Sequence, residues 1–489
     1  MQSPINIYDE SELTRLILKD QTTSGIAAVV HHMYKYKYVY NMGGWYEFMN
    51  HRWVEIETVV SLEKKIGNEV VNEYLKRITY YNQNAYESQE HKDQYLQIGK
   101  NLTDATYKLR DNKIEIVEEC KYLFNNSHFI NKFDSNPDLL GFDNGVYDLK
   151  SGEFREGRPE DCVSKTTGYD YNTEHTPETT DAINEFMARI FPDTEVRDYV
   201  FTLLASFLDG HPDQKCYIWV GAGGNGKSTL LELFESAIGG YAVRIPGVTL
   251  TQETHMTPNQ SNPEITRLKG SRIVSTQELE KFNINTLRNW TSGDRMVGRN
   301  LYNPQNDFKP QFKLVCCCNS LPSLSPYDEG VWRRIRVLEF RSRFVDQPDP
   351  NNNQYEFKED CHLTKKLGVW KGAFMFMLLE HYKIYKENGI HEPKQILDAT
   401  TEYHLKQTIR SKSDDSDDES DDSDSDSISD ECDDDSDSDS DVISDGEYDA
   451  EMLFVDWWKR SNKLCRADMK SFLEKDVAIL EKEHNGKHI

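Results

Sequence analysis

Residues 221–228 read Gly-Ala-Gly-Gly-Asn-Gly-Lys-Ser, and this stretch decides the fold of the chain. It matches G-x-x-x-x-G-K-[ST], a pattern in which glycines let backbone N–H groups approach the phosphates of a nucleotide. The apolar run 216–220 before it predicts a buried strand, and 228–238 after it predicts a helix that stops at two glycines. Strand, loop and helix N-terminus together predict a phosphate-binding loop in an α/β domain. A glycine-rich turn without a ligand is the alternative.

The contacts expected from this loop follow from the chemistry of nucleotide phosphates. Lys227 is expected to reach the β- and γ-phosphates, and the Ser228 hydroxyl is expected to bind Mg²⁺. The residues predicted to bind the nucleotide are Gly221, Gly223, Gly224, Asn225, Gly226, Lys227, Ser228 and Thr229.

The charge of the chain is unevenly distributed. The formal net charge is −27, but residues 413–449 contain twenty Asp or Glu and no Lys or Arg, which leaves −7 for the rest. Residues 265–345 carry a net charge of +7, so the overall acidity does not exclude nucleic acid as a partner. The tract 411–446 is almost purely Ser, Asp and Glu, and it predicts a disordered linker. An electrostatic mimic of nucleic acid is the alternative interpretation of this tract.

Cysteine usage and hydropathy indicate a soluble protein of a reducing compartment. The nine cysteines form no C-x-x-C pair, and Cys316, Cys317 and Cys318 lie in an apolar, strand-like run. Neighbouring residues of a strand face opposite ways, so these three predict buried, reduced thiols rather than a ligand cluster. No signal peptide and no apolar run near 18 residues is present, and no membrane partner is expected.

The N-terminal part, to about residue 175, is rich in aromatic residues. Lysine and tyrosine alternate over 34–40, which predicts a strand with one lysine-bearing face. That face is either solvated over an aromatic core or a nucleic-acid contact. Turns are predicted at 41–44, 50–52 and 144–145, with Trp45 and Trp53 on the intervening strands, and helices are predicted over 178–209 and 362–388.

Two polar residues are predicted to follow buried strands of the α/β domain. The short strand 272–277 ends at Glu278, a carboxylate that can hold a Mg²⁺-bound water and orient the attacking water. Glu280 is either a second carboxylate of the site or solvated. The strand 312–318 ends at Asn319, whose amide can sense a γ-phosphate if it lies beside the loop.

Several basic residues are candidates for contacts with phosphates. Arg333 and Arg334 precede a predicted core strand, where they form either a surface ion pair or a finger that completes a neighbouring subunit's site. A hairpin is predicted from strands 295–302 and 308–315, with its turn at 303–306. Its basic residues Arg295, Arg299 and Lys309 either grip nucleic-acid phosphates or form a solvated ladder.

Taken together, these motifs resemble the superfamily 3 helicases, and more narrowly the helicase part of poxvirus-type primase–helicases of large DNA viruses and phages. The segments that carry the resemblance are GAGGNGKST (221–229), RIVSTQELE (272–280), TSGDRMVGRNLY (291–302), the strand ending at Asn319, and VWRRIRVLEF (331–340). In that family they correspond to Walker A, Walker B, motif B′, sensor 1 and the arginine finger. The resemblance covers roughly residues 25–405.

The resemblance implies an α/β fold with a P-loop, AAA+-like superfamily 3 helicase core. The expected parts are a mixed α+β N-terminal domain (1–175), a helical collar (176–211), the P-loop ATPase (212–345), a helical C-terminal subdomain (346–410), the disordered acidic tract (411–447) and a small helical tail (448–489). No primase domain is expected beside these parts. The hairpin turn lacks an obvious Lys or His at its tip, which departs from the family pattern.

The activity implied by the resemblance is that of an ATP-dependent replicative DNA helicase with Mg²⁺ as cofactor. It would act as a homo-hexameric ring on single-stranded or forked DNA, with a separate primase or polymerase as a further partner. The expected location is the host cytoplasm or nucleus. A viral DNA-packaging ATPase and a non-enzymatic replication scaffold controlled by ATP are the alternatives.

Overall fold

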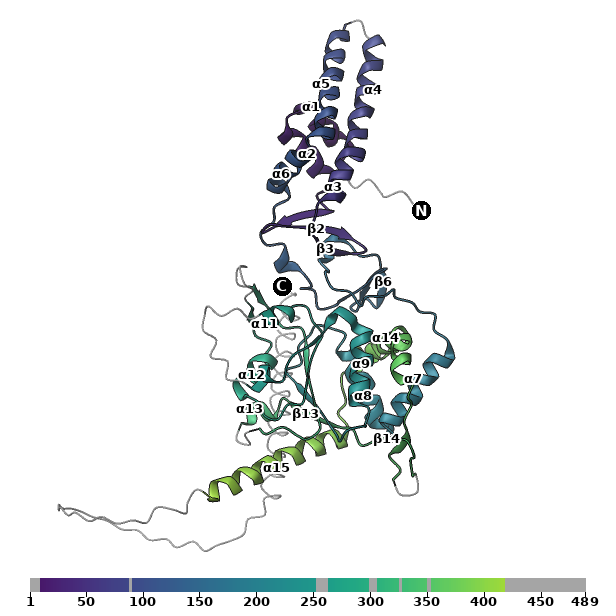
Figure 1. Cartoon of the computed structure of the whole chain (residues 1–489), viewed down its shortest axis with the longest axis vertical. Coiled ribbons are helices and arrows are strands. Elements are labelled where there is room, and N and C mark those ends of the chain that lie inside the picture. The colour runs from purple at the N-terminus through teal and green to yellow at the C-terminus, as the bar shows by residue number, and fades with distance from the viewer. Residues whose placement is uncertain are drawn as a thin grey trace, which may run out of the picture. The chain divides into compact units, whose positions relative to one another are not determined.

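The computed structural model of the chain describes residues 9–87, 90–251, 263–298, 306–324, 328–349 and 353–417 (Figure 1). The predictions made for Arg299, for most of the acidic tract and for the tail 448–489 lie outside the described residues. Side chains are described as far as residue 410.

Helices and two three-stranded antiparallel sheets make up the N-terminal part. The helices are α1 (Glu10–Lys19), α2 (Thr23–Tyr34), α3 (Val60–Lys65), which continues through a π-helical turn (Ile66–Val70) into α4 (Val71–Glu87), α5 (Lys92–Asp111) and α6 (Lys113–Phe124). The sheets are β1 (Tyr38–Asn41), β2 (Gly44–Met49) and β3 (Arg52–Ile56), and β4 (Leu139–Phe142), β5 (Gly145–Asp148) and β6 (Glu153–Arg155). Figure 1 shows α4 and α5 packed side by side as a helical hairpin.

Two of the predicted elements in this part are placed differently. The strand predicted over 34–40 begins only at Tyr38, because Tyr34 ends α2 with its side chain buried on the same face as Val30. Helical spacing of buried residues therefore overrides the tyrosine–lysine alternation. The turn predicted at 144–145 lies one residue earlier, since Phe142 pairs directly with Gly145. Trp45 and Trp53 lie on strands β2 and β3, as predicted.

A five-stranded parallel sheet forms the centre of the second part. Its spatial order is β13 (Ile335–Glu339), β7 (Cys216–Val220), β12 (Lys313–Cys318), β9 (Ile273–Gln277) and β8 (Ala242–Arg244). These strands are apolar along most of their length, as expected for parallel strands that are covered on both faces. β12 lies between β7 and β9, so the ends of the three strands that carry predicted site residues are neighbours.

Helices cover both faces of this sheet (Figure 1). One face packs on α7 (Pro177–Ile190), α8 (Thr194–Ser206), α9 (Lys227–Ile238) and α14 (Leu363–Asn388). The other face packs on α10 (Val248–Thr251), α11 (Pro263–Arg267), α12 (Ile284–Thr291), α13 (Glu329–Trp332) and α15 (Lys394–Asp417). The helical stretch predicted over 178–209 is thus two helices, because Pro192 cannot continue α7 and the Asp193 side chain caps α8.

The three consecutive cysteines confirm the alternation expected of a strand. Cys316 and Cys318 pack in the core on one face of the sheet, and Cys317 packs in the core on the other. All three are free and buried, and burial raises the pKa of Cys317 to about 12, so the thiols stay protonated at neutral pH. In the described ranges no helix combines the length and apolar character needed to cross a bilayer.

Two short strand pairs and the last helix complete the fold. β10 (Met296–Gly298) and β11 (Asn306–Phe308) form an antiparallel hairpin, and β14 (Arg343–Val345) pairs in parallel with β15 (Glu356–Lys358). The second strand of the predicted hairpin begins at Asn306, inside the predicted turn, and ends at Phe308, because residues 309–312 leave the ladder before β12 begins; residues 299–305 lie outside the described residues. Helix α15 continues to Asp417, so the first residues of the tract predicted to be disordered are helical.

Candidate functional site

The loop 221–226 leads from the buried strand β7 into helix α9. Gly224 and Gly226 have φ angles of +73° and +86°, in the left-handed region that glycine adopts without strain. Gly226 is the N-cap of α9 and offers no side chain to the N–H groups of the first turn. By contrast, Thr176, Asp193 and Asn283 cap α7, α8 and α12 with side-chain oxygens. The Lys227 N–H donates to Asn225 Oδ1 at 3.4 Å, and the other N–H groups of the first turn together with the helix dipole give α9 the terminus of an anion site.

The Lys227 side chain folds back over the loop. Its Nζ donates to the carbonyl oxygen of Gly221 at 2.5 Å and to Asn225 Oδ1 at 3.1 Å. It also lies 3.5 Å from Oδ1 of Asn319, at the end of the neighbouring strand β12. The residue is buried, and this burial lowers the pKa of Lys227. The ammonium is therefore held by neutral acceptors alone, a set that an anionic phosphate oxygen would outcompete.

The loop is braced by close backbone packing. A Cβ on Gly221 would lie 2.2 Å from Asn225 Nδ2, so the absence of a side chain there makes room for the Asn225 amide. The N–H of Phe344 donates to the Gly224 carbonyl at 2.7 Å. A Cβ on Gly226 would lie 3.0 Å from Ile190 at the end of α7. The loop conformation is thus fixed from both the α7 side and the β13–β14 side.

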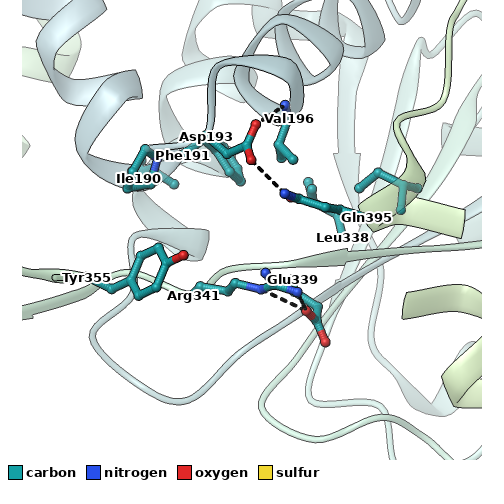
Figure 2. Close-up of a pocket in the computed structure, with 11 residues that line it drawn as sticks. Ile190, Phe191, Asp193, Val196, Leu338, Glu339, Arg341, Tyr355 and Gln395 are labelled. Carbon is teal, nitrogen blue, oxygen red and sulfur yellow. Dashed lines mark hydrogen bonds and ion pairs between the residues drawn. The ribbon is translucent and has the colours of Figure 1, made fainter. Parts of the chain in front are cut away.

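Figure 2 shows a cavity on this braced side, between α7, α8, β13 and α15. The Asp193 carboxylate accepts from Gln395 Nε2 at 2.6 Å, and Arg341 pairs with Glu339 at 2.7 Å, while the half-buried Tyr355 closes another side. Its volume of about 40 Å³ holds no more than a few waters. This cavity is therefore too small to be a preformed pocket for a nucleobase, and the hydrogen bond from Gln395 to Asp193 beside it ties α15 to the start of α8.

The sheet register brings the predicted polar residues to the same edge. Cys318 pairs with Val220, so Asn319 is level with Gly221, and the N–H of Glu278 donates to the Cys317 carbonyl at 2.9 Å. Both side chains are exposed at this edge. Glu278 has a φ of +55°, one of few positive values among the described non-glycine residues. Such a conformation costs about 1 kcal/mol and is found where a side chain must be aimed.

Ser228 and Thr229 are the first residues of α9 after the lysine. Ser228 is exposed and Thr229 is half-buried. An exposed hydroxyl at the start of α9 and the exposed Glu278 carboxylate after β9, which β12 separates from β7, are oxygen donors of the kind Mg²⁺ takes, with water filling its other positions. The residues present therefore fit the ion that the sequence predicts. Among the described residues no group of three or more His, Cys, Asp or Glu forms a separate metal cluster.

Arg333 and Arg334 lie at the other end of the strands, where β7 and β13 begin. Ile335 pairs with Cys216, the first residue of β7, so both arginines are separated from the loop by the whole strand, about 16 Å at about 3.3 Å per residue. Arg334 is half-buried and donates from Nη1 to the Thr291 carbonyl at 2.9 Å and from Nε to the Gly330 carbonyl at 3.1 Å. Arg333 is exposed, and within the described ranges its guanidinium has no hydrogen bond or ion pair. Neither arginine can serve its own loop.

The predicted DNA contacts lie partly on described residues. Arg295 and Lys309 flank the hairpin β10–β11 and are both exposed. Met296 pairs with Phe308, so Arg295 and Lys309 lie at the same end of the hairpin, each one residue beyond its last pair. Arg299 lies outside the described residues.

Two buried cations were missed by reasoning from the sequence. Arg272, just before β9, donates to the carbonyl oxygens of Leu208 and Leu139, at 3.2 and 3.1 Å. Lys313, the first residue of β12, pairs with Asp209 at 2.7 Å with both side chains buried. The signal for them was a charged residue at the start of an otherwise apolar strand.

The chain is similar in sequence to known viral proteins over most of its length. Residues 27–192 match a family model described as D5 N terminal like, and residues 219–334 match a family of unknown function, DUF5906. The chain is 33% identical over 392 residues to L207/L206 of Acanthamoeba polyphaga mimivirus, named as a candidate helicase, a match that covers 76% of this chain and 41% of the relative. It is 28% identical over 457 residues to 121R of Invertebrate iridescent virus 3, named likewise, with 82% and 48% covered.

The chain thus spans less than half the length of these relatives. Among solved structures, the apo C-terminal region of NrS-1 matches with a TM-score of 0.42 and 13% identity, over 75% of this chain and 71% of that one. The N-terminal model match and the two viral relatives together show that the chain belongs to the D5-type primase–helicase family of large DNA viruses.

Proposed function

We propose that the chain is the motor part of an ATP-driven replicative DNA helicase, built on a P-loop, AAA+-like core of superfamily 3. The observation that carries the proposal is the meeting of Lys227 and Asn319 at the ends of neighbouring strands, with Nζ 3.5 Å from Oδ1. A glycine-rich turn without a ligand has no need of an ammonium and an amide side by side at a helix N-terminus whose N-cap residue, Gly226, has no side chain. A γ-phosphate needs both.

ATP would bind with its phosphates against the loop and the first turn of α9. Lys227 would exchange the carbonyl oxygen of Gly221 for phosphate oxygens, which form stronger, charge-assisted hydrogen bonds. Ser228 and Glu278 would hold Mg²⁺, which neutralises charge on the phosphates when bound. The rigid bracing of the loop lowers the cost of binding, because little conformational freedom remains to be lost.

The polar residues at the strand ends would divide the work of hydrolysis. Glu278, held in a strained backbone conformation, orients the attacking water, and Asn319 contacts the γ-phosphate. Arg333 supplies positive charge to the phosphates of a neighbouring protomer, since the length of β7 separates it from its own loop. Arg334 positions Arg333 by fixing the end of α13 to Thr291. A site shared in this way requires an oligomer, and a hexameric ring is the form that the resemblance implies.

DNA is the polymer favoured for this motor. The mimivirus and iridescent-virus relatives are named as candidate helicases, and the hairpin beside the sheet carries Arg295 and Lys309 on exposed positions. Contacts between such side chains and phosphates are independent of sequence, as a translocating enzyme requires.

A strand-displacement assay on forked DNA tests the proposal. The full chain should separate the strands in the presence of ATP and Mg²⁺, and Lys227→Ala should lose both strand separation and ATP turnover while still binding the fork. Lys383→Ala, a change of an exposed lysine on α14, is the matched control and should keep full activity. ATP turnover with movement along blunt duplex but no strand separation would indicate a packaging motor. Nucleotide binding without turnover would indicate a scaffold, and either result would refute the helicase.

A further inference from the structure

A hollow of about 460 Å³ lies between the N-terminal part and the hairpin β10–β11. Asn131 and Phe133 line one side, and Arg295 and Lys309 line the other. Its volume is in the range of sites that hold small organic groups. It lies at the edge of the central sheet where β9 and β12 begin, because Gly270 and Gln311 also line it.

The charges around the hollow favour an anion. Arg295 and Lys309 each lie one residue beyond the pair of Met296 and Phe308, at the same end of the hairpin, so two like charges line the hollow together and an anion between them would offset their repulsion. Lys269 adds a third cation on the wall, and the buried Arg272 donates a hydrogen bond to Gln311, which also lines the hollow. Two acids also line the hollow, Asp134 and Asp307.

Of these acids, Asp134 is buried and its carboxylate is already hydrogen-bonded. Its Oδ1 accepts hydrogen bonds from the backbone N–H of Ser164 at 2.8 Å and of Lys165 at 3.2 Å, and its Oδ2 accepts from the Ser164 hydroxyl. These donors occupy the carboxylate and hold it in the wall. Arg295 and Lys309 are exposed beside the hairpin, as is Asp307, so the exposed charged side chains of the lining carry a net charge of +1.

The two sides of the hollow are tied together before any ligand binds. Gln311 Nε2 donates to the carbonyl oxygen of Asp134 at 2.9 Å, and Lys269 Nζ donates to that of Ile130 at 2.5 Å. Gly270 has a φ of +70°, and a Cβ there would lie 2.5 Å from Asp134 Cβ. This close approach keeps the N-terminal wall against the residues that precede β9, and such preorganisation favours binding.

The N-terminal wall also carries an aromatic surface. Phe133 packs edge-on against Tyr46 and Phe129, with ring centroids 5.5 and 4.8 Å away, and remains half-buried. Aromatic rings beside basic side chains are the combination by which proteins bind single-stranded nucleic acid, through stacking and phosphate contacts. A duplex, whose major groove alone is about 12 Å wide, does not fit a hollow of this volume.

We propose that this hollow binds single-stranded DNA, with phosphates between Arg295 and Lys309 and a base against Phe133. The N-terminal part is thereby half of the DNA site, and the hairpin is the other half. This inference rests on the proposed function, because it names where the motor holds its polymer.

Anisotropy of a fluorescent oligothymidylate, measured on the full chain without nucleotide, tests the hollow. Asn131→Glu places a negative charge on the exposed N-terminal wall, and Asn72→Glu, on an exposed position of α4, is the matched control. Asn131→Glu should weaken binding about fivefold, the effect of one like charge about 4 Å from a phosphate in water. Asn72→Glu should bind like the unmodified chain.

Two further measurements are independent of that variant. Arg295→Gln and Lys309→Gln should each lower the slope of log affinity against log salt by about one. An oligonucleotide containing 5-iodouridine, which crosslinks to neighbouring aromatic rings on illumination, should label the peptide that contains Phe133 in the unmodified chain. Unchanged affinity of Asn131→Glu, unchanged salt slopes, or crosslinks confined to peptides outside 131–135 would each overturn the proposal.

The outcome is separable from that of the proposed function. Binding is measured without ATP, so a chain that fails to hydrolyse ATP but binds through the hollow refutes the motor and keeps the DNA site. If the unmodified chain unwinds forks but Asn131→Glu binds DNA as tightly as the unmodified chain, the proposed motor stands and the proposed DNA site in the hollow is refuted.

Discussion

Replacing Lys313 with methionine tests what holds strand β12, which carries Asn319 at its other end. The buried Lys313 ammonium donates three hydrogen bonds, to the carbonyl oxygens of Ser206 (2.7 Å) and Asp209 (2.8 Å) and to Asp209 Oδ1 (2.7 Å). Methionine fills a similar volume but donates none of them. The buried Asp209 carboxylate would keep only the Tyr382 hydroxyl and the His211 N–H as described donors.

An unpaired buried carboxylate and two lost carbonyl contacts set the size of the effect. Removing one partner of a buried ion pair costs about 3–5 kcal/mol, and we expect Lys313→Met to lower the free energy of unfolding by that amount. Adding Asp209→Asn to Lys313→Met removes the uncompensated charge and should restore about 1–2 kcal/mol. Lys383→Met breaks an exposed pair with Glu380, both about half exposed, and should change stability by less than about 0.5 kcal/mol.

Urea unfolding followed by circular dichroism and tryptophan fluorescence measures these differences. The order expected is unmodified chain and Lys383→Met most stable, the double variant next, and Lys313→Met least stable. A Lys313→Met chain as stable as Lys383→Met would show that the ammonium does not hold the strand. A double variant less stable than Lys313→Met would show that the cost is lost packing rather than an unpaired charge.

Three further predictions concern the loop and the arginines. Arg333→Ala should abolish ATP turnover but keep nucleotide binding. Mixing this variant with Lys227→Ala should recover part of the turnover at hybrid sites. Arg334→Ala should have the same effect on turnover and should in addition lower the midpoint of urea unfolding. Gly226→Ala should destabilise the chain by about 1–2 kcal/mol, because its φ of +86° is strained for alanine, and should weaken ATP binding measured by calorimetry. A hydrogen bond from Arg288 on α12 lowers the pKa of Asp328. The contribution of this carboxylate to stability is therefore present at neutral pH and is lost as the pH falls through the folded-state pKa. Asp328→Asn, which keeps a capping side chain, should lower the midpoint of urea unfolding at pH 7 but not at low pH.

The phosphate loop and its strand could be predicted because their signals are local. An apolar run, glycines at positions that need positive φ, and a helix without polar capping residues are all visible within about twenty residues of Gly224. The end of β12 at Asn319 was predictable for the same reason, since a polar residue follows an unbroken apolar strand. The order in which the strands pair is not encoded by a local signal. That Asn319 lies beside Lys227 follows from the order of the sheet.

The buried cations and the hollow could not be predicted from the sequence. Arg272 finds acceptors 133 residues earlier at Leu139, and Lys313 finds one 107 residues earlier at Ser206. A charged residue at the start of a strand is solvated in most proteins, and only distant partners reveal that it is buried. Tyr34 failed in a similar way, because the helix that buries it outweighs a local alternation of tyrosine and lysine.

Strands β9 and β12 run from the hollow, where they begin, to the proposed nucleotide site, where they end. Gly270 and Gln311 line the hollow just before β9 and β12, and Glu278 and Asn319 follow these strands at the nucleotide edge. β12 pairs with β7 on one side and with β9 on the other. Neither β9 nor β12 can therefore slide along its neighbour by part of a residue step without breaking the hydrogen bonds between the strands. A displacement of the hollow's wall must therefore either move the strand ends as a unit or break the contacts of Arg272 and Lys313. Movement of the strands as a unit requires less free energy, because breaking the buried hydrogen bonds of Arg272 and Lys313 costs more than a small rigid shift of a packed strand.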